Sequence, residues 1–367
     1  MKIQVIQSHL YKSLRVVQPM FIDPHVHCRD EEQSHKETIE HALRVAERAG
    51  FTAIFDMPNT ARPVTTRERV EERLVIARRV NSVVQYGLYM ALTADLEQVK
   101  RAVETFQDLS QVVGFKLYAG HSVGNIGVIT EEEQGRIYET LAREGYTRVV
   151  VIHCEKESLI RKKIDGSQDW DPADPITHAY ARPEEAEVES VKDQLRLAKQ
   201  AQYKGILHIA HISIPESVRL THSDPDLHVT CGVTPHHLLL DYTAMQQPNG
   251  ILLKMNNPLR SPGMNTELLN MLREGVITFV ETDHAPHTLD EKLRPPYMSG
   301  ITNLQKYPKF IRWLRGQGFD EERIRAVTFD KIVDTFGIKI EPRSCTPEYD
   351  LESEYPFDPY KGLGVLD

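Results

Sequence analysis

The residues that most clearly indicate chemistry are two histidines, His25 and His27, near the start of the chain. They stand between Phe21 and Asp30, where an apolar run passes into a polar end. Side chains two residues apart on a strand point to the same face, so both imidazoles can reach one ion. Histidine is the most common protein ligand for transition metals. A His-x-His pair alone is weakly specific, so the prediction of a metal site depends on what surrounds it.

Four later apolar runs also end in residues that bind metals or move protons. His153, His211 and Asp283 close three of these runs, and Lys116 closes the fourth. Each has an ordinary explanation when taken alone: a histidine often hydrogen-bonds in a core, a lysine snorkels from a strand end, and an aspartate caps a helix. Their joint position at the ends of apolar runs predicts one shared site.

The chemistry that this set predicts is metal-assisted hydrolysis with one or two divalent ions. A lysine bridges two metals only when it is deprotonated or carboxylated, and a carbamate on Lys116 would offer two anionic oxygens. Asp283 would then take a proton from water and return it to a leaving nitrogen.

The elements that must position these residues alternate regularly between strand and helix. Apolar strand-like runs lie near residues 21, 53, 86, 113, 150, 207, 229 and 278, and helical periodicity separates most of them. Repeated alternation of this kind predicts a parallel sheet with both faces covered. Eight units between residues 20 and 300 predict an α/β fold of the (β/α)8, TIM-barrel type, which keeps its active site at the C-terminal ends of the strands.

The rest of the chain is expected to be accessory to that barrel. Residues 1–19 read as a short hairpin-like segment, and residues 301–367 as helices and a tail that pack on the barrel. Residues 165–183 are polar and rich in proline, which predicts a long substrate-covering loop. We expect His178 and Arg182 to brace this loop against Glu187, and His208 to face away from the site.

Composition narrows the class of protein. The formal net charge of -9 and the pI near 6.0 argue against a nucleic-acid or anionic-membrane surface. No apolar run approaches the roughly 20 residues of a membrane-spanning helix. The four cysteines are far apart and form no Cys-x-x-Cys pair, which argues against a disulfide framework or a zinc knuckle. We therefore expect a cytoplasmic enzyme that acts on a small molecule.

The chain resembles the dihydroorotases of the amidohydrolase superfamily. The similarity covers most of residues 20 to 300, and the order of its motifs is far more specific than any single motif. The stretches that carry it are Asp23-Pro-His-Val-His-Cys-Arg-Asp30, Asp56-Met-Pro-Asn-Thr60, Lys116-Leu-Tyr118, His153-Cys-Glu155, Ala181-Arg-Pro-Glu-Glu-Ala-Glu187, His208-Ile-Ala-His211, Thr234-Pro-His-His-Leu238, Lys254-Met-Asn-Asn-Pro-Leu-Arg260 and Thr282-Asp-His-Ala-Pro-His287.

The resemblance implies a binuclear zinc enzyme that interconverts N-carbamoyl-L-aspartate and L-dihydroorotate in pyrimidine biosynthesis. It implies that His25 and His27 hold one ion, that His153 and His211 hold the other, and that carboxylated Lys116 bridges them. Asp283 would be a ligand and the acid/base. The residues implied in substrate binding are Arg29, Asn59, Asn256 and His287. A dianionic substrate needs a cation with parallel N–H donors for its carboxylate, which the guanidinium of Arg29 can supply.

The sequence also departs from the family pattern and leaves alternatives open. The small β-sandwich that family members build beside the barrel is expected to be reduced or absent. Asn257 stands where the family commonly has proline, and residues 299–305 are divergent. The alternatives are a hydantoinase, dihydropyrimidinase or allantoinase, and a non-catalytic paralogue that serves as a structural partner. A homodimer and association with other pyrimidine-pathway enzymes also remain open.

Overall fold

The computed structural model describes residues 21–121, 126–340 and 345–366. Its strands form one eight-stranded sheet in which each strand pairs in parallel with the next along the chain. The strands are β1 (Phe21–Val26), β2 (Phe51–Asp56), β3 (Gln85–Ala91), β4 (Val112–Ala119), β5 (Val149–Cys154), β6 (Ile206–Ile209), β7 (His228–Val233) and β8 (Phe279–Val280). The eight predicted strands are therefore confirmed, and the described residues add no second sheet to them.

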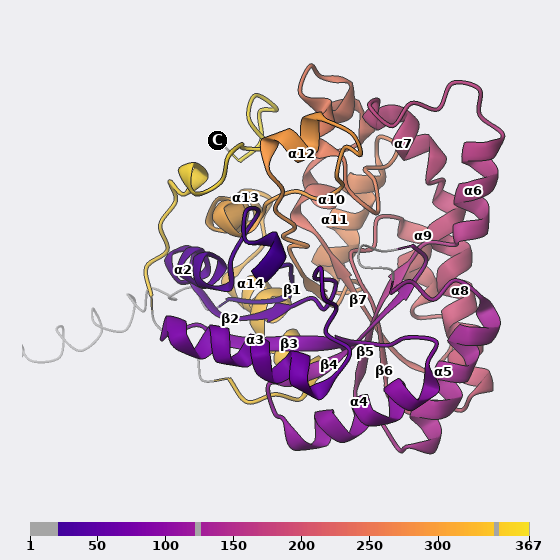
Figure 1. The fold of residues 1–367 in the computed structure, drawn as a ribbon. Coiled ribbons are helices and arrows are strands. Elements are labelled where there is room, and N and C mark those ends of the chain that lie inside the picture. The colour runs from indigo at the N-terminus through magenta and orange to yellow at the C-terminus, as the bar shows by residue number, and fades with distance from the viewer. Residues whose placement is uncertain (1–20, 122–125, 341–344, 367) are drawn as a thin grey trace, which may run out of the picture.

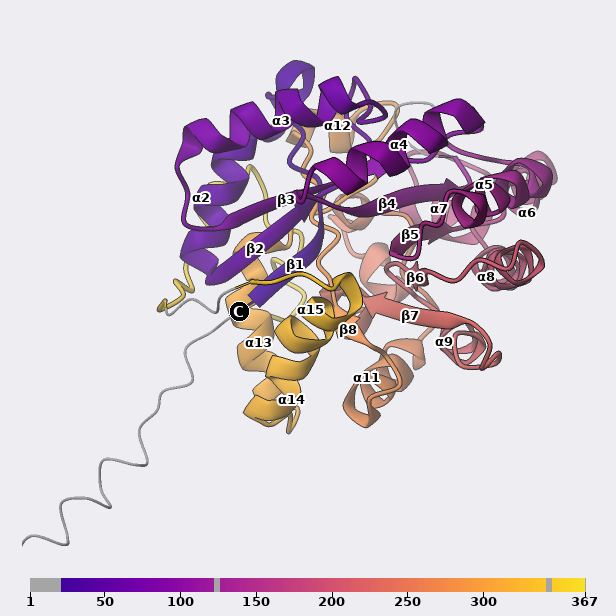
Figure 2. The same cartoon turned by 90° about the horizontal axis from the view of Figure 1, so that it is seen from below.

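The sheet curves into a nearly closed barrel. A bridge between Val26 and His284 joins the last strand region to β1, and the His27 amide donates to the His284 carbonyl at 2.8 Å. Helices surround the strands, as the view in Figure 2 shows. The predicted (β/α)8 architecture is confirmed, and it places the polar strand ends around one mouth.

Several of the helices outside the barrel begin and end where the sequence gives clear signals. Thr38 caps one helix at its start and Gly50, with a φ of 92°, ends it, while Thr130 and Glu133 form the predicted capping box of another. These helices (Figure 1) are α2 (Ile39–Ala49), α3 (Arg67–Val80), α4 (Leu96–Asp108), α5 (Glu131–Arg143), α6 (Glu157–Asp165), α7 (Pro175–Ala181), α8 (Glu184–Gln200), α9 (Pro215–Leu220), α10 (Pro235–Leu239), α11 (Met264–Glu274) and α12 (Leu289–Leu293).

Residues 165–183 were expected to form a long substrate-covering loop, but the segment is not a loop throughout. Helix α7 lies inside that range because Asp174 caps it and Pro175 occupies its first turn. His178 and Arg182 do not brace this segment against Glu187 either. His178 bonds with the Met255 carbonyl at 3.1 Å, and Arg182 donates to Glu155.

The C-terminal part of the chain closes the barrel at its N-terminal end. It contains α13 (Tyr307–Gly316), α14 (Glu321–Arg325), the π-helical turn η5 (Ala326–Asp330) and α15 (Lys331–Phe336). Phe329, Ile332 and Phe336 join the cluster of side chains that fills the barrel interior, together with Phe55 and Tyr89. The predicted segment 1–19 lies outside the described residues.

The tail after α15 reaches back to the mouth of the barrel. Tyr355 donates to Glu37 at 2.8 Å and lies 3.0 Å from His284 Nε2. Tyr360 donates to Asn303, whose amide in turn donates to the Thr282 carbonyl at 2.7 Å. Both tyrosines are buried, so this tail is part of the support beneath the site.

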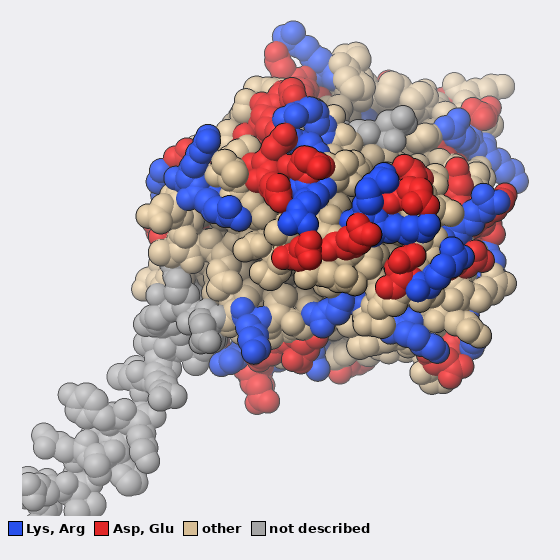
Figure 3. Space-filling model, turned by 60° about the horizontal axis from the view of Figure 1, so that its bottom comes forward, with Lys and Arg blue, Asp and Glu red and all other residues tan. Residues whose placement is uncertain are grey.

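The surface carries charges of both signs. Basic and acidic side chains lie interspersed on the face drawn in Figure 3. Exposed pairs such as Arg67 with Glu71, four residues apart on α3, are typical of this surface, and water and salt screen them strongly. Among the described residues, none of the helices is both long and apolar enough to cross a lipid bilayer.

Candidate metal centre and substrate pocket

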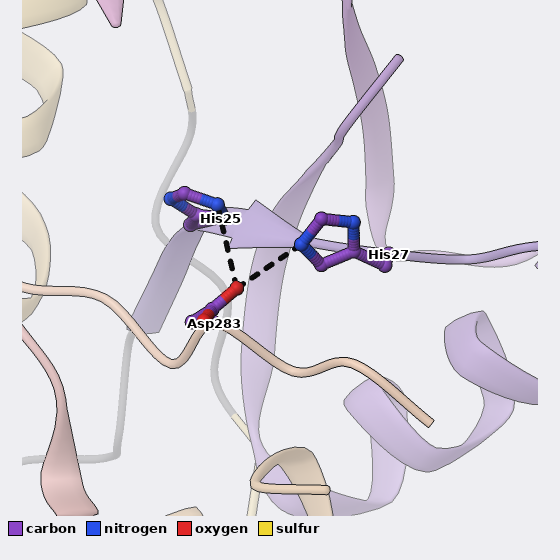
Figure 4. A group of neighbouring side chains, drawn as sticks. All are labelled: His25, His27 and Asp283. Atoms are coloured by element: carbon purple, nitrogen blue, oxygen red, sulfur yellow. Dashed lines mark hydrogen bonds and ion pairs between the residues drawn. The ribbon is translucent and has the colours of Figure 1, made fainter. Parts of the chain in front are cut away.

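Three of the predicted site residues converge at the end of β1. Donor atoms of His25, His27 and Asp283 all lie within 4.8 Å of one another, and Figure 4 shows both imidazoles directed at the carboxylate. The three side chains are buried. The backbone of Asp283 has a φ of 47°, a left-handed conformation that is costly for a residue with a side chain and is typical of functional sites.

The outer partners of the two histidines determine which ring nitrogen faces the site. His25 Nδ1 donates to Glu281 at 3.2 Å, and His27 Nδ1 donates to the Asn59 carbonyl oxygen at 2.7 Å. Burial lowers the pKa of His27, and burial with the charge of Lys116 lowers the pKa of His25 to about 4, so both rings are neutral at pH 7. Each Nε2 then presents a lone pair to Asp283 Oδ1, at 3.5 Å from His25 and 3.0 Å from His27.

Three electron-rich atoms directed at one point fit a cation placed between them. A proton on either Nε2 would require the loss of the outer hydrogen bond or a charge on a buried ring. The donor set is therefore suited to a divalent metal ion, and its outer hydrogen bonds are those that orient metal-bound histidines.

His153 and His211 form a second group of the same kind. His153 Nε2 donates to Glu155 at 3.0 Å, which turns Nδ1 toward His211 Nε2 at 3.2 Å. Nδ1 of His211 is buried and has no hydrogen-bond partner among the described residues. The His211 backbone is also left-handed, with a φ of 39°. Two facing imidazole nitrogens at this separation again suit a shared cation.

Lys116 lies between these groups on β4 and is fully buried. Nζ has no hydrogen-bond partner within the described parts of the chain, although the Tyr118 ring centroid lies 5.1 Å away. Burial lowers the pKa of the Lys116 ammonium from its ordinary value of 10.5 to about 8, so roughly a tenth of the amine is uncharged at pH 7. An uncharged amine is the form that reacts with carbon dioxide to give a carbamate.

One cavity of about 80 Å³ brings nearly all of the predicted site residues together. Its lining includes His25, His27, Arg29, Asn59, Lys116, His153, His211, Asn256 and Asp283. His287 lies just outside this lining and contacts Arg29, with 3.4 Å between its Nε2 and an Arg29 guanidinium nitrogen. A larger cavity of about 680 Å³ next to α7 contains none of these residues.

Arg29 is a buried guanidinium that forms no ion pair with any carboxylate in the described residues, and its Nε has no partner. Burial lowers its pKa. Arg29 also has a left-handed backbone, with a φ of 48°. A buried cation without a counter-ion is costly, and an anionic ligand relieves that cost.

The two asparagines are less free than their predicted roles suggest. The side-chain oxygen of Asn59 accepts a hydrogen bond from His27 Nδ1, which leaves the NH2 group of Asn59 for another partner. The side-chain oxygen of Asn256 lies 3.0 Å from His178 Nε2. Asn59 therefore orients a histidine in addition to lining the cavity.

The residues that sequence reasoning missed are the outer partners. Glu281 and Glu155 hold His25 and His153, and both carboxylates are buried. Glu281 stands two residues before Asp283, and Glu155 stands two residues after His153. Residues two apart on an extended strand share a side, so this spacing was the signal in the sequence that could have identified them. His208 does not face away from the site. It stacks on Phe279 inside the barrel, and its Nε2 lies 3.5 Å from Glu281.

Comparison with solved structures places the fold among the cyclic amide hydrolases. An L-hydantoinase (dihydropyrimidinase) from Arthrobacter aurescens superposes with a TM-score of 0.77 at 25% identity, over 89% of this chain and 72% of that one. A dihydropyrimidinase from Brevibacillus agri gives a TM-score of 0.80 at 20% identity, over 95% and 81%. The second likeness shows the fold alone. No protein-family model matches the chain.

Sequence comparison gives closer relatives. The dihydroorotase of Macrococcus caseolyticus is 33% identical over 313 residues, which cover 82% of this chain and 70% of that protein. The dihydroorotase of Methanothermobacter thermautotrophicus is 31% identical, over 89% and 71%. That of Listeria welshimeri is also 31% identical, over 94% and 80%. Identity of this extent, over a barrel whose mouth gathers the predicted ligands, shows that the chain belongs to the dihydroorotase family of cyclic amide hydrolases.

Proposed function

We propose that this protein catalyses the zinc-dependent, reversible cyclisation of N-carbamoyl-L-aspartate to L-dihydroorotate in pyrimidine biosynthesis. Family membership supports the reaction class. The observation that supports this choice of substrate is Arg29. It is a buried guanidinium beside the histidine and aspartate cluster, and it forms no ion pair with a carboxylate in the described chain. L-Dihydroorotate brings to this cavity the carboxylate that Arg29 lacks.

The donor geometry supports the metal-holding roles that the family resemblance implies. His25, His27 and Asp283 would hold one zinc ion, His153 and His211 would hold the second, and carboxylated Lys116 would bridge them. The chemistry that two such ions would supply is polarisation of the amide carbonyl of the ring and a lower pKa of the attacking water.

Asp283 is the group that moves the proton. Its Oδ1 already faces His25 and His27, and its side chain lines the cavity. In hydrolysis it would take a proton from the water and deliver it to the ring nitrogen as the amide bond breaks. In cyclisation the same carboxylate would remove the proton from the ureido nitrogen.

The remaining cavity residues would bind and orient the substrate. Arg29 would pair with its carboxylate, and His287, kept uncharged because burial lowers its pKa, would add a hydrogen bond. The amide of Asn59 and the side chain of Asn256 would bind the amide edge of the ring. The rim of this cavity also includes Ser299 and Gly300, from the divergent 299–305 segment.

A second reading is hydrolysis of an uncharged ring, as the names of the hydantoinase and dihydropyrimidinase neighbours suggest. That substrate would leave Arg29 buried and unpaired in the closed complex, which is costly. The test compares L-dihydroorotate with dihydrouracil, the same ring without the carboxylate, and with hydantoin and allantoin, on the zinc-loaded protein. Turnover confined to L-dihydroorotate and lost in Lys116→Ala supports the proposal, whereas preference for dihydrouracil refutes it.

The cellular setting is also part of the proposal. A cytoplasmic enzyme of this pathway would receive its acyclic substrate from other pyrimidine enzymes. It would act as a single chain, as a homodimer, or in a larger assembly with those enzymes. Light scattering of the purified protein, alone and mixed with the other pathway enzymes, tests these associations.

A further inference from the structure

Glu281 occupies the layer directly beneath the candidate metal centre. Its side chain is 1% exposed, and it stands between β8 and Asp283. Oε2 accepts a hydrogen bond from His25 Nδ1 at 3.2 Å. Oε1 accepts one from the His211 backbone amide at 2.5 Å. One carboxylate thus contacts two residues that come from different strand ends, His25 on β1 and His211 just after β6, and that belong to different histidine groups.

We propose that Glu281 is a positioning residue that fixes the ring of His25 and the backbone of His211 relative to each other. It thereby couples the geometry of the two metal positions. The inference rests on the metal roles given under the proposed function. Glu281 fixes the His25 tautomer, because the proton on Nδ1 leaves the Nε2 lone pair directed at the cation position. It also holds the His211 backbone in its left-handed conformation by accepting the amide proton of that residue.

A carboxylate meets both demands, whereas an amide of the same length does not. Two N–H donors approach two different oxygens, and a glutamine has one acceptor oxygen, so it would leave one of the donors facing an NH2 group. A buried donor without a partner is destabilising, and the ring or backbone that carries it would turn away.

The neighbouring strand is shaped to admit this carboxylate. A Cβ placed on Gly232 of β7 would lie 2.2 Å from Glu281 Oε1 and 2.6 Å from its Cδ, distances that no real contact allows. Gly232 therefore leaves the space in which Glu281 stands. On the far side His208 stacks on Phe279, with 4.5 Å between ring centroids, and closes the space below Oε2.

The experiment measures metal affinity separately from turnover. Wild type, Glu281→Gln and Gly232→Ala are stripped of metal, and zinc binding is measured by competition with a chromophoric chelator. The first variant removes one acceptor, and the second keeps the carboxylate but displaces it. We expect both to bind zinc about 10-fold to 100-fold more weakly, the usual effect of losing an outer partner of a metal ligand. The absorption bands of the cobalt-loaded variants should shift, because these bands report ligand geometry.

Glu187→Gln is the matched control. Glu187 is also a buried carboxylate, and it accepts hydrogen bonds from Ser213, Asn257 and Arg260, but it contacts none of the predicted metal ligands. It should lower the melting temperature of the metal-free protein while leaving zinc affinity and the cobalt spectrum as in wild type.

The outcomes separate the inference from the proposed function. Weakened zinc binding in Glu281→Gln and Gly232→Ala, but not in Glu187→Gln, supports the role of Glu281 whichever ring the enzyme hydrolyses. Zinc affinity in Glu281→Gln equal to that of wild type overturns it, as does an equal loss in Glu187→Gln. If Glu281→Gln does not fold, Gly232→Ala decides by the same criteria. A wild-type protein that binds no divalent metal refutes both ideas.

Discussion

Replacement of Arg29 by methionine is expected to stabilise the free protein and to remove its preference for an anionic ring. Arg29 is 4% exposed, and within the described chain it has no carboxylate partner. Methionine has a similar length and no charge, so it fills the space without the desolvation penalty. Replacing buried charges by apolar side chains of similar size has stabilised other proteins by about 1–4 kcal/mol.

The effect on catalysis has the opposite sign. A buried charge–charge contact between Arg29 and the substrate carboxylate is worth about 3–5 kcal/mol when one partner is removed. At about 1.36 kcal/mol for each factor of ten, kcat/KM for L-dihydroorotate should fall roughly 150-fold to 5000-fold. Turnover of dihydrouracil should change little, because that ring has no carboxylate.

The assay follows kcat/KM for both rings together with the melting temperature of the ligand-free protein. Arg73→Met is the matched control, since Arg73 is equally buried but forms an ion pair with Asp56. Its removal leaves the buried Asp56 carboxylate without a cationic partner and should lower the melting temperature instead. A kcat/KM for L-dihydroorotate within tenfold of wild type in Arg29→Met, or a melting temperature that falls as it does in Arg73→Met, would refute this reasoning.

Three further predictions concern the metal and the support of the site. Dialysis against a chelator should abolish turnover, zinc should restore it, and elemental analysis should find fewer ions per chain in Lys116→Ala than in wild type. Burial alone would raise the pKa of Glu37, but hydrogen bonds from His284 and His41 lower it to about 2, against an ordinary value of 4.5. Ionised Glu37 therefore contributes roughly 3 kcal/mol above pH 4.5, which is lost as pH falls toward 2. In urea unfolding, the difference in unfolding free energy between wild type and Glu37→Gln should therefore be smallest at the acidic end of that range. Tyr355→Phe should lower the unfolding free energy by about 1 kcal/mol and speed proteolysis of the tail.

The barrel and the gathering of the site residues were predictable because both depend on local pattern and on one topological rule. Apolar runs that end in His25, Lys116, His153 and Asp283 define strands, and a parallel barrel brings all of their C-terminal ends to one mouth. No distance in the folded protein was needed for that step.

What the sequence could not predict depends on contacts between distant segments. The role of Glu281 requires that Gly232 leave a space on the neighbouring strand, and nothing in the local sequence of either residue shows this. Asn59 was expected to bind substrate, but its carbonyl oxygen faces His27 because of the path of the loop after β2. Helix α7 was missed because its seven residues are too few to show periodicity among prolines and polar residues.

The tail that carries Tyr355 and Tyr360 has a consequence for how the enzyme is made. The cluster that would bind metal uses residues from His25 to Asp283. The two neighbours of Asp283 are held by tyrosines that are synthesised much later. Tyr360 holds Thr282 through Asn303, and Tyr355 contacts both His284 and Glu37. A nascent chain that has been synthesised as far as Asp283 therefore possesses every proposed ligand, but it lacks the tyrosines that hold the two neighbours of Asp283. Metal capture during synthesis should consequently lag behind barrel formation, and full affinity should appear only once Tyr360 has left the ribosome.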